Sequence, residues 1–446
     1  MSFCPHTPED VAEMLAVIGA ETMEDLFSVI PPEQRASPYR LRSEGGSETE
    51  VLGHLGQLAA GNDTSLISFL GGGFYDHFIP AAVDSLSSRA EFVTCYTPYQ
   101  AECSQGTLQA LYEYQSAICR LTGLEVANAS NYDGGSALAE AVLMARRITR
   151  RSCTLIDGSI NPLHLAVVKT YLSGTDGEIV VVPPDGCRSS LEQLIANLDD
   201  TTASVVLPQP NFFGSISDFS EVLCQARRVG ALAVSASYPM SLGLLRSPGE
   251  QGFDIAVGEG QSLGNPLSFG GPCLGFLATR RSYARQLPGR VAGATVDGEG
   301  RRGFVLTLQA REQHIRRQRA TSNICSNQGL CALRALIYLS CLGREGFSGL
   351  ARLNYDKAHY ALDLLTDIPG VSPANRSPVF NEFTLRLPRP AGQVSSRLLA
   401  AGFAAGLPLD GFFPERSGEL LVAVTEKRTS SEIERYAEAL RRELVG

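Results

Sequence analysis

Residues 96–106 concentrate polar side chains on a turn that contains Pro98. Two tyrosines, two glutamines, a glutamate and a serine stand close together; they are Tyr96, Tyr99, Gln100, Glu102, Ser104 and Gln105. Phenol, amide and carboxylate groups donate and accept directed hydrogen bonds. This turn is therefore a candidate recognition loop.

Two other stretches have residue types that suit anion binding. They are Gly134, Gly135 and Ser136, which lead into an apolar helix, and Thr321, Ser322 and Asn323, which follow an arginine-rich helix. Backbone N–H groups at a helix N-terminus attract phosphate, and arginines beside hydroxyls suit anions. A simpler interpretation stays open for each stretch. The glycines and serine of the first are common in any loop before a helix, and the arginines of the second are also expected on a solvent-exposed helix.

The loop Gly258–Pro272 follows a short apolar strand and precedes another, a usual place for a site in an α/β protein. It contains Glu259, Gln261 and Asn265, but neither lysine nor histidine. Of the 38 basic residues in the chain, the lysines are only Lys169, Lys357 and Lys427. Very few amines are therefore available for Schiff-base chemistry.

Short Val/Leu/Ile runs alternate with helical patterns from Cys153 onward, which predicts a doubly wound, mostly parallel sheet. The expected strands are 154–157, 178–182, 203–207, 232–236, 254–257 and 274–278, and the expected helices between them are 162–172, 190–198 and 219–229. An antiparallel return through Leu274 is plausible. Residues 7–18, 22–29 and 48–60 are expected to be helical, as are the first half of 309–328 and residues 329–342. We expect a helical N-terminal cap over 1–60, a large α/β domain over 61–330 and a small α+β domain over 331–446.

The composition of the 446-residue chain excludes several classes of protein. The net charge of −9 and the lack of a basic cluster with interleaved aromatics argue against nucleic-acid binding. No apolar run approaches the ~20 residues that span a bilayer, and the early acidic residues exclude a targeting peptide, so we expect a cytoplasmic protein. The eleven cysteines form no C-x-x-C pair and the six histidines are isolated, so we expect no disulfide framework and no metal site.

A helical cap, a parallel-sheet domain with a Gly-rich helix start and a small C-terminal domain describe the fold-type I group of pyridoxal-phosphate enzymes. In that group an Asp at the end of a mid-sheet strand pairs with the pyridinium nitrogen, and a lysine one strand later holds the cofactor. Here Ser235-Ala236-Ser237 ends the mid-sheet strand without a carboxylate, and Gly258–Pro272 has no lysine. The expected fold suits a pyridoxal-phosphate enzyme, but the acid that pairs with the pyridinium nitrogen and the lysine that holds the cofactor are both missing.

Several motifs in order make a resemblance specific. They are YTPYQAECSQGTLQALYEYQ at 96–115, FYDH at 74–77, GQSLG at 260–264, FGGP at 269–272, REQH at 311–314 and ATSNIC at 320–325. Nearly the whole chain resembles the glycine cleavage system P-protein family. In its length and its lack of the cofactor lysine, this chain resembles subunit 1, the alpha subunit of the split, two-gene form of glycine dehydrogenase (decarboxylating).

The resemblance implies a role in glycine decarboxylation. The complex decarboxylates glycine and passes the aminomethyl group to the lipoyl arm of the H-protein. Pyridoxal phosphate is held covalently by subunit 2, and two copies of each subunit usually form a heterotetramer. We then expect the recognition loop to support the partner's active site, and the chain alone to be inactive. Gly134–Ser136 and Thr321–Asn323 become a vestigial cofactor or anion pocket.

Three other readings are weighed against this one. A purely structural partner of subunit 2 would contribute no active-site residue. An independent fold-type I enzyme would need an unusual cofactor anchor. A nicotinamide enzyme is disfavoured, because neither Gly71-Gly72-Gly73 nor Gly134-Gly135 has the spacing of a G-x-G-x-x-G motif.

Overall fold

The computed structural model describes residues 5–35 and 45–445, in two compact units, Met1–Thr64 and Ser65–Gly446. The first unit contains the helices α1 (Pro8–Ile18) and α2 (Glu48–Ala60) and the 3-10 turns η1 (Met23–Phe27) and η2 (Pro32–Gln34). Thr7 caps α1, since its hydroxyl accepts from the Asp10 amide and the Asp10 carboxylate accepts from the Thr7 amide. The predicted start of α1 is confirmed, whereas the predicted helix at 22–29 is only a 3-10 turn. The three-domain division at 60 and 330 stays a prediction.

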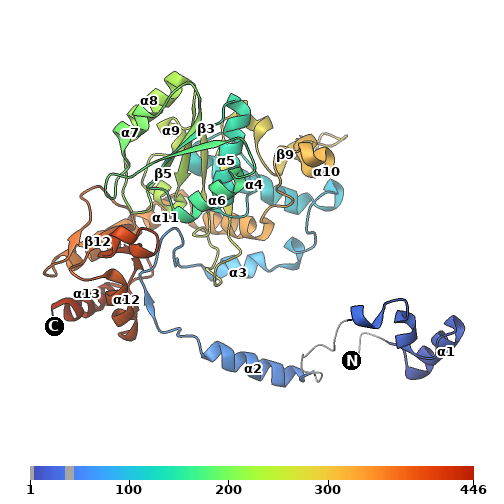
Figure 1. The fold of residues 1–446 in the computed structure, drawn as a ribbon. Coiled ribbons are helices and arrows are strands. Elements are labelled where there is room, and N and C mark those ends of the chain that lie inside the picture. Colours follow the sequence, from blue (N-terminus) through green and yellow to red (C-terminus); the bar gives the residue numbers. More distant parts are fainter. Residues whose placement is uncertain (1–4, 36–44, 446) are drawn as a thin grey trace. The chain divides into compact units, whose positions relative to one another are not determined.

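The second unit is built on a seven-stranded sheet (Figure 1). Its strands in spatial order are β2 (Val126–Ala127), β8 (Gly275–Thr279), β7 (Ile255–Glu259), β6 (Leu232–Ser237), β5 (Thr202–Gln209), β3 (Cys153–Asp157) and β4 (Glu178–Val182). The five strands from β7 to β4 are parallel, while β8 runs antiparallel to β7 and β2 antiparallel to β8. The predicted parallel sheet and the antiparallel return are confirmed.

Helices cover both faces of this sheet. The helices are α4 (Gln105–Thr122), α5 (Gly134–Thr149), α6 (Pro162–Leu172), α7 (Leu191–Ala196), α8 (Ser220–Val229) and α9 (Pro248–Gln251). Neighbouring residues of β5 face opposite layers: Val206 packs in the core with α5, and Val205 in the core with α7 and α8. Figure 1 shows α7 and α8 on one side of the strands and α5 and α6 on the other. Strands buried on both faces explain the continuous apolar runs in the sequence.

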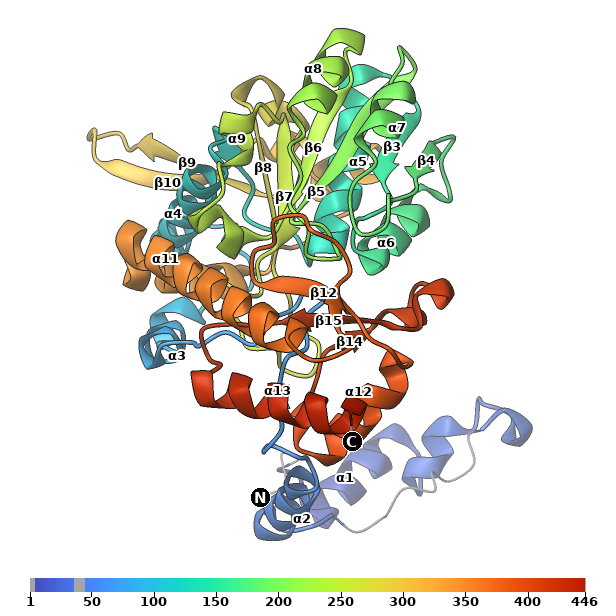
Figure 2. The same cartoon turned by 90° about the vertical axis from the view of Figure 1, so that its left-hand side faces the viewer.

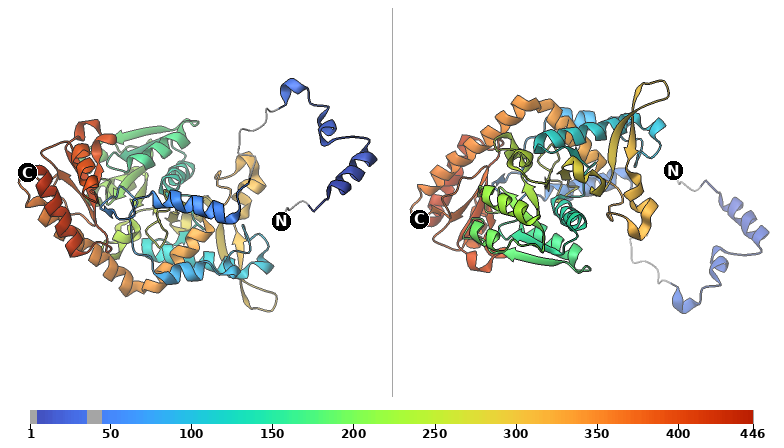
Figure 3. Two further views of the ribbon diagram at one scale, coloured as in Figure 1. Left: turned by 90° about the horizontal axis from the view of Figure 1, so that it is seen from below. Right: turned by 90° about the horizontal axis from the view of Figure 1, so that it is seen from above.

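Residues 291–319 depart from the predicted structure. An antiparallel hairpin, β9 (Val291–Val296) and β10 (Arg302–Thr307), was not predicted and projects from the body (Figures 2 and 3). The predicted charged helix that begins at 309 is wrong. Only α10 (Gln313–Arg316) is helical, between the 3-10 turns η7 (Gln309–Arg311) and η8 (Arg317–Arg319). Extended backbone at Glu312 separates η7 from α10, and a positive φ angle at Arg317 ends α10.

A long helix leads into the C-terminal layer (Figure 2). The helix α11 (Gly329–Thr366) begins where predicted but continues past a break at Gly343, where φ is 60°. The strands β11 (Ser372–Pro373), β12 (Glu382–Arg386), β15 (Glu419–Ala423) and β14 (Leu407–Pro408) form a small antiparallel sheet in that order. The helices α12 (Ala391–Ala400) and α13 (Ser430–Val445) pack on it, as an α+β arrangement requires. Two short parallel strands, β1 (Ile67–Ser68) and β13 (Phe403–Ala404), join the start of this unit to the same layer, and α3 (Ala81–Ser87) packs on α11.

Candidate functional site

A cavity lies at the carboxyl ends of the parallel strands, the usual ligand position in such a sheet. Its lining residues are Gly73, Tyr75, Gly134, Ile160, Asn161, His164, Pro208, Pro210, Asn211, Phe212, Ala236, Ser237, Tyr238, Val257, Gly258, Glu259 and Glu382. None of them is a lysine. Lys357 instead donates to the carbonyls of Glu426 and Arg428, and Lys427 pairs with Asp76 at 2.7 Å.

The N-terminus of α5 is bonded to a carboxylate of this same chain. The Gly134 amide donates to Glu259 Oε2 at 2.9 Å, and the amides of Gln261 and Leu274 donate to Glu259 Oε1 at 2.9 and 3.0 Å. Burial raises the pKa of Glu259 to about 7, although the three amides act in the opposite direction. The predicted anion position of Gly134 therefore has an internal partner.

The end of β6 presents hydroxyl groups. Ser235 Oγ and Ser237 Oγ lie 2.7 Å apart, and Ser237 lines the cavity. The His164 ring also lines it, and burial lowers the pKa of His164 to about 4, so the imidazole is neutral near pH 7. No carboxylate stands at the end of this strand to hold a protonated pyridine.

The residues of this cavity do not fit pyridoxal phosphate, the cofactor that the fold suggests. A lysine is lacking among the lining residues, and the end of β6 offers no acid. A Cβ atom added at Gly134 would lie 2.9 Å from the Glu259 amide nitrogen, so the space in front of α5 is filled by protein. The cavity has the position of a cofactor site without its donor set.

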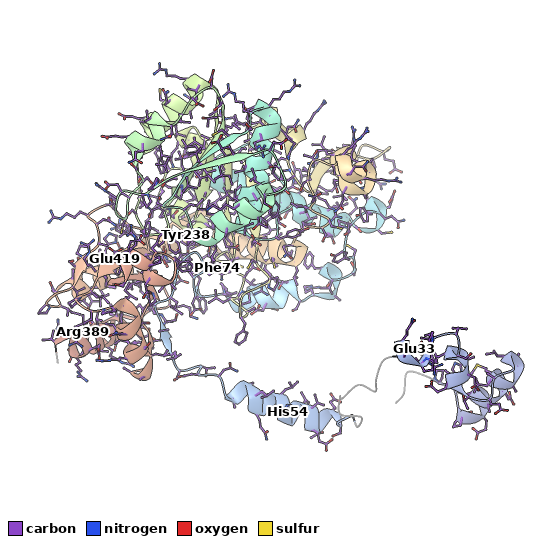
Figure 4. All side chains as sticks on the ribbon, in the orientation of Figure 1. Glu33, His54, Phe74, Tyr238, Arg389 and Glu419 are labelled. Carbon is purple, nitrogen blue, oxygen red and sulfur yellow. The ribbon has the colours of Figure 1, made fainter. Side chains whose placement is uncertain are left out.

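Buried polar contacts close the far side of the cavity. Tyr75 donates to Glu382 Oε2 at 2.8 Å and the Gly72 amide donates to Glu382 Oε1 at 2.6 Å. The glycine at 71 is required here, because a Cβ atom would lie 2.0 Å from Glu382 Oε1. Tyr238 lies near the junction of the sheet domain and the C-terminal layer (Figure 4), where it contacts His77. The Gly71–Gly73 turn thus lies directly against Glu382 of the C-terminal layer.

Most side chains of the recognition loop are exposed, and some of these also hold the loop to the rest of the chain. Tyr96 is 91% exposed, with its hydroxyl 2.9 Å from Ser326 Oγ, and Gln100 and Glu102 are also exposed. The Gln105 amide group bonds the backbone N–H and C=O of Phe304 in β10, each at 2.8 Å. Buried Ser104 donates to Cys95 Sγ at 3.8 Å. The structure brings these residues to one surface loop away from the residues that line the cavity.

Below this loop lies a buried ion pair that sequence reasoning missed. Arg290 is 2% exposed, donates to the Tyr99 hydroxyl at 2.9 Å, and has its Nε atom 3.7 Å from Glu312 Oε2. Arg290 Nε and Nη1 and Glu312 Oε1 make no hydrogen bond in the described part of the chain. His314 Nδ1 lies 3.7 Å from the same Glu312 oxygen. The REQH motif was visible in the sequence, but its pairing with Arg290 was not.

The polar turn 321–325 contacts α5 at Glu140 and also contacts Tyr132, just before the helix begins. Ser322 Oγ donates to Glu140 Oε1 at 2.6 Å, and the Cys325 amide donates to the Tyr132 hydroxyl. Of the six residues predicted to form an anion pocket, Gly134 alone lines the cavity. The joint role of Gly134–Ser136 and Thr321–Asn323 stays a prediction.

Residues 5–35 and 45–445 contain neither a membrane-spanning helix nor a metal cluster. No helix there has the length and apolar character needed to cross a membrane. No cluster of three or more His, Cys, Asp or Glu side chains there is arranged to hold a metal ion.

Comparison with known proteins shows the family. A model of the glycine cleavage system P-protein family matches residues 1–440. The chain belongs to this family. A curated relative from Citrifermentans bemidjiense, named probable glycine dehydrogenase (decarboxylating) subunit 1, is 59% identical over 99% of both chains. A relative of the same name from Geotalea uraniireducens is 57% identical over 99% of both chains. The predicted family and enzyme class are confirmed.

Solved structures agree on the fold of this P-protein family member. A crystal structure of glycine decarboxylase (P-protein) in inhibitor-bound form has a TM-score of 0.91, 44% identity and full coverage of both chains. A sphingosine-1-phosphate lyase from Burkholderia pseudomallei has a TM-score of 0.65 at 16% identity, covering 93% of this chain and 94% of its own, and supports the fold alone. The predicted pyridoxal-phosphate fold type I is confirmed.

Proposed function

We propose that this chain is subunit 1 of a heteromeric glycine decarboxylase that functions only with a second subunit. The complex removes CO2 from glycine and transfers the aminomethyl group to the lipoyl arm of the H-protein. Subunit 2 holds pyridoxal phosphate on its own lysine, and the cofactor supplies the electron sink for decarboxylation. The complex is a cytoplasmic heterotetramer with two copies of each subunit.

The observation that carries this proposal is the cavity at the carboxyl ends of the parallel strands, which is lined by no lysine. The lining residues offer neither a Schiff-base amine nor an acid at the end of β6, and Glu259 takes the Gly134 amide. Relatives that match the chain from end to end are named subunit 1. A chain with this frame and without the cofactor's donors needs a partner for catalysis.

The recognition loop is the part of this chain that supports the partner's active site. Tyr96 and Tyr99 bound the partner's cofactor cavity, and Gln100 and Glu102 hydrogen-bond there. Gln105, predicted to do the same, supports the loop through its bonds to Phe304. Supporting this assignment, Tyr96 and Glu102 are exposed although their groups are suited to recognition. The turn Thr321–Cys325 is a second candidate for the same interface.

Reconstitution tests the proposed function. The chain is co-expressed with the candidate subunit 2, and glycine–CO2 exchange is measured with and without it. We expect exchange only when both subunits are present. Pyridoxal phosphate added to this chain alone should give no absorption band of a lysine-bound cofactor. Such a band, or exchange by either subunit alone, contradicts the proposal.

Two substitutions separate active-site support from a purely structural role. Tyr96→Phe and Glu102→Ala are each assembled with subunit 2, and assembly is checked by size-exclusion chromatography before exchange is measured. Active-site support predicts that exchange falls about tenfold or more while assembly is retained. Unchanged exchange in both variants excludes this role and favours a scaffold that only stabilises subunit 2.

A further inference from the structure

We propose that the Glu259 carboxylate is a built-in anion at the N-terminus of α5, so that this chain excludes phosphate and phosphorylated ligands from its own cavity. The proposal concerns this chain alone. It does not rest on the partner subunit or on the recognition loop, so this inference and the proposed function can fail separately.

The contacts of Glu259 are those that a bound phosphate would make. Three backbone amides converge on its two oxygens: that of Gly134, the first residue of α5, that of Gln261 within the loop Gly258–Pro272, and that of Leu274 just after the loop. A carboxylate accepts hydrogen bonds only, so the ionised form satisfies all three donors. Amides and the positive end of a 16-residue helix are the usual partners of a phosphate.

Glycines hold Glu259 in this position through direct backbone contact. A Cβ atom on Gly258 would lie 2.1 Å from the Ser237 carbonyl oxygen, and one on Gly275 would lie 2.2 Å from the Asp133 carbonyl oxygen. The strand that carries Glu259 therefore fits closely between β6 and β8, with β8 pressed on the start of α5. These glycines position an internal anion and leave little freedom for Glu259 to move aside.

A second anion at this position would meet both an occupied cage and like charge. Glu259 is 6% exposed, and a phosphate that reached the Gly134 amide would displace its carboxylate or lie beside it. Two buried anions that share one set of donors repel strongly. Asp133, the capping residue of α5, adds a further negative charge nearby. The site is therefore closed to phosphate by charge as well as by space.

Titration of the full-length chain with inorganic phosphate tests the proposal. Calorimetry is carried out at about pH 8, where Glu259 is ionised. The wild-type chain should show no saturable heat. Glu259→Ala removes the carboxylate and exposes three amides, and it should bind one phosphate at least about tenfold more tightly than the wild type. Glu259→Gln is the matched control: it fills the same space, and we expect no binding.

In the titration, two outcomes overturn the proposal: one-to-one phosphate binding by the wild-type chain, or a folded Glu259→Ala variant that binds no better than wild type. Because the alanine variant leaves three amides unpaired, its refolding yield is also measured in phosphate and in chloride at equal ionic strength. A higher yield in phosphate supports the built-in anion. Equal yields contradict it.

Discussion

Buried charged side chains are hydrogen-bonded differently in the cavity at the sheet edge and beneath the recognition loop. In the cavity, Glu259 and Glu382 have both carboxylate oxygens bonded to groups of this chain. Below the loop, Arg290 and Glu312 are nearly as buried, yet three of their polar atoms have no hydrogen-bond partner among the described residues. The two cavity glutamates are fully bonded within the chain, and the ion pair below the loop is not.

This difference concerns stability. A buried donor or acceptor without a partner costs about 1–3 kcal/mol, so most native proteins avoid it. Arg290 and Glu312 are 2% and 8% exposed, so their unbonded atoms lie inside the protein beneath the recognition loop. Glu259 and Glu382 stand at the position that carries a cofactor in related folds, and their carboxylates are bonded within the chain.

The largest expected effect is on the loop side. Arg290→Met removes the cation beside buried Glu312 and the donor to Tyr99. We expect the free energy of unfolding to fall by about 3–4 kcal/mol, because an unpaired buried charge remains. Urea denaturation measures this change. The double variant Arg290→Met/Glu312→Leu should recover part of the loss. A change below about 1 kcal/mol would show that the pair is hydrated, and the contrast between the two regions would not hold.

The next effect tests the cavity side through pH. Burial raises the pKa of Glu382 to about 7, so the folded state binds its proton more tightly than the unfolded state does. Its contribution to stability is therefore complete below the unfolded pKa and is lost as the pH rises through about 7. Glu382→Gln cannot ionise. Between about pH 5 and pH 8, the stability of wild type relative to this variant should fall by roughly 3 kcal/mol.

A glutamate of opposite behaviour provides the control for that pH series. Burial raises the pKa of Glu426, but the bonds from His77 and from the Phe78 amide lower it to about 2 overall. Its contribution is present above the unfolded pKa and is lost only as the pH falls toward 2. The stability of wild type relative to Glu426→Gln should therefore rise from about pH 2 to pH 5, opposite in sign to the fall expected for Glu382 at higher pH. A fall over this acid range would show that the lowered pKa of Glu426 is wrong.

Local sequence signals predicted most of the regular structure. The order of strands and helices follows from short apolar runs and from caps such as Thr7, whose partners lie within three residues. The site contacts join distant positions: Gly134 and Glu259 are 125 residues apart, and Gly72 and Glu382 are 310 apart. Strand pairing in the large sheet brings the first pair together, and packing of the turn before α3 on the C-terminal sheet brings the second pair together. The absence of a lysine was visible in the sequence. The bond of the Glu259 carboxylate to the start of α5 was not, because it joins residues far apart in the chain.

The smallest expected effect separates anchors from exposed residues within the recognition loop itself. Gln105 pairs with the N–H and C=O of Phe304, so Gln105→Ala leaves two part-buried backbone groups without partners. We expect the free energy of unfolding of the chain to fall by about 1–2 kcal/mol. Glu102→Ala, three residues earlier on the exposed side of the same turn, should change it by less than about 0.5 kcal/mol. Urea denaturation of the isolated chain compares the two. Equal losses would mean that Glu102 is also an anchor, and a reduced activity of its variant would then report loop unfolding instead of a lost contact with the partner.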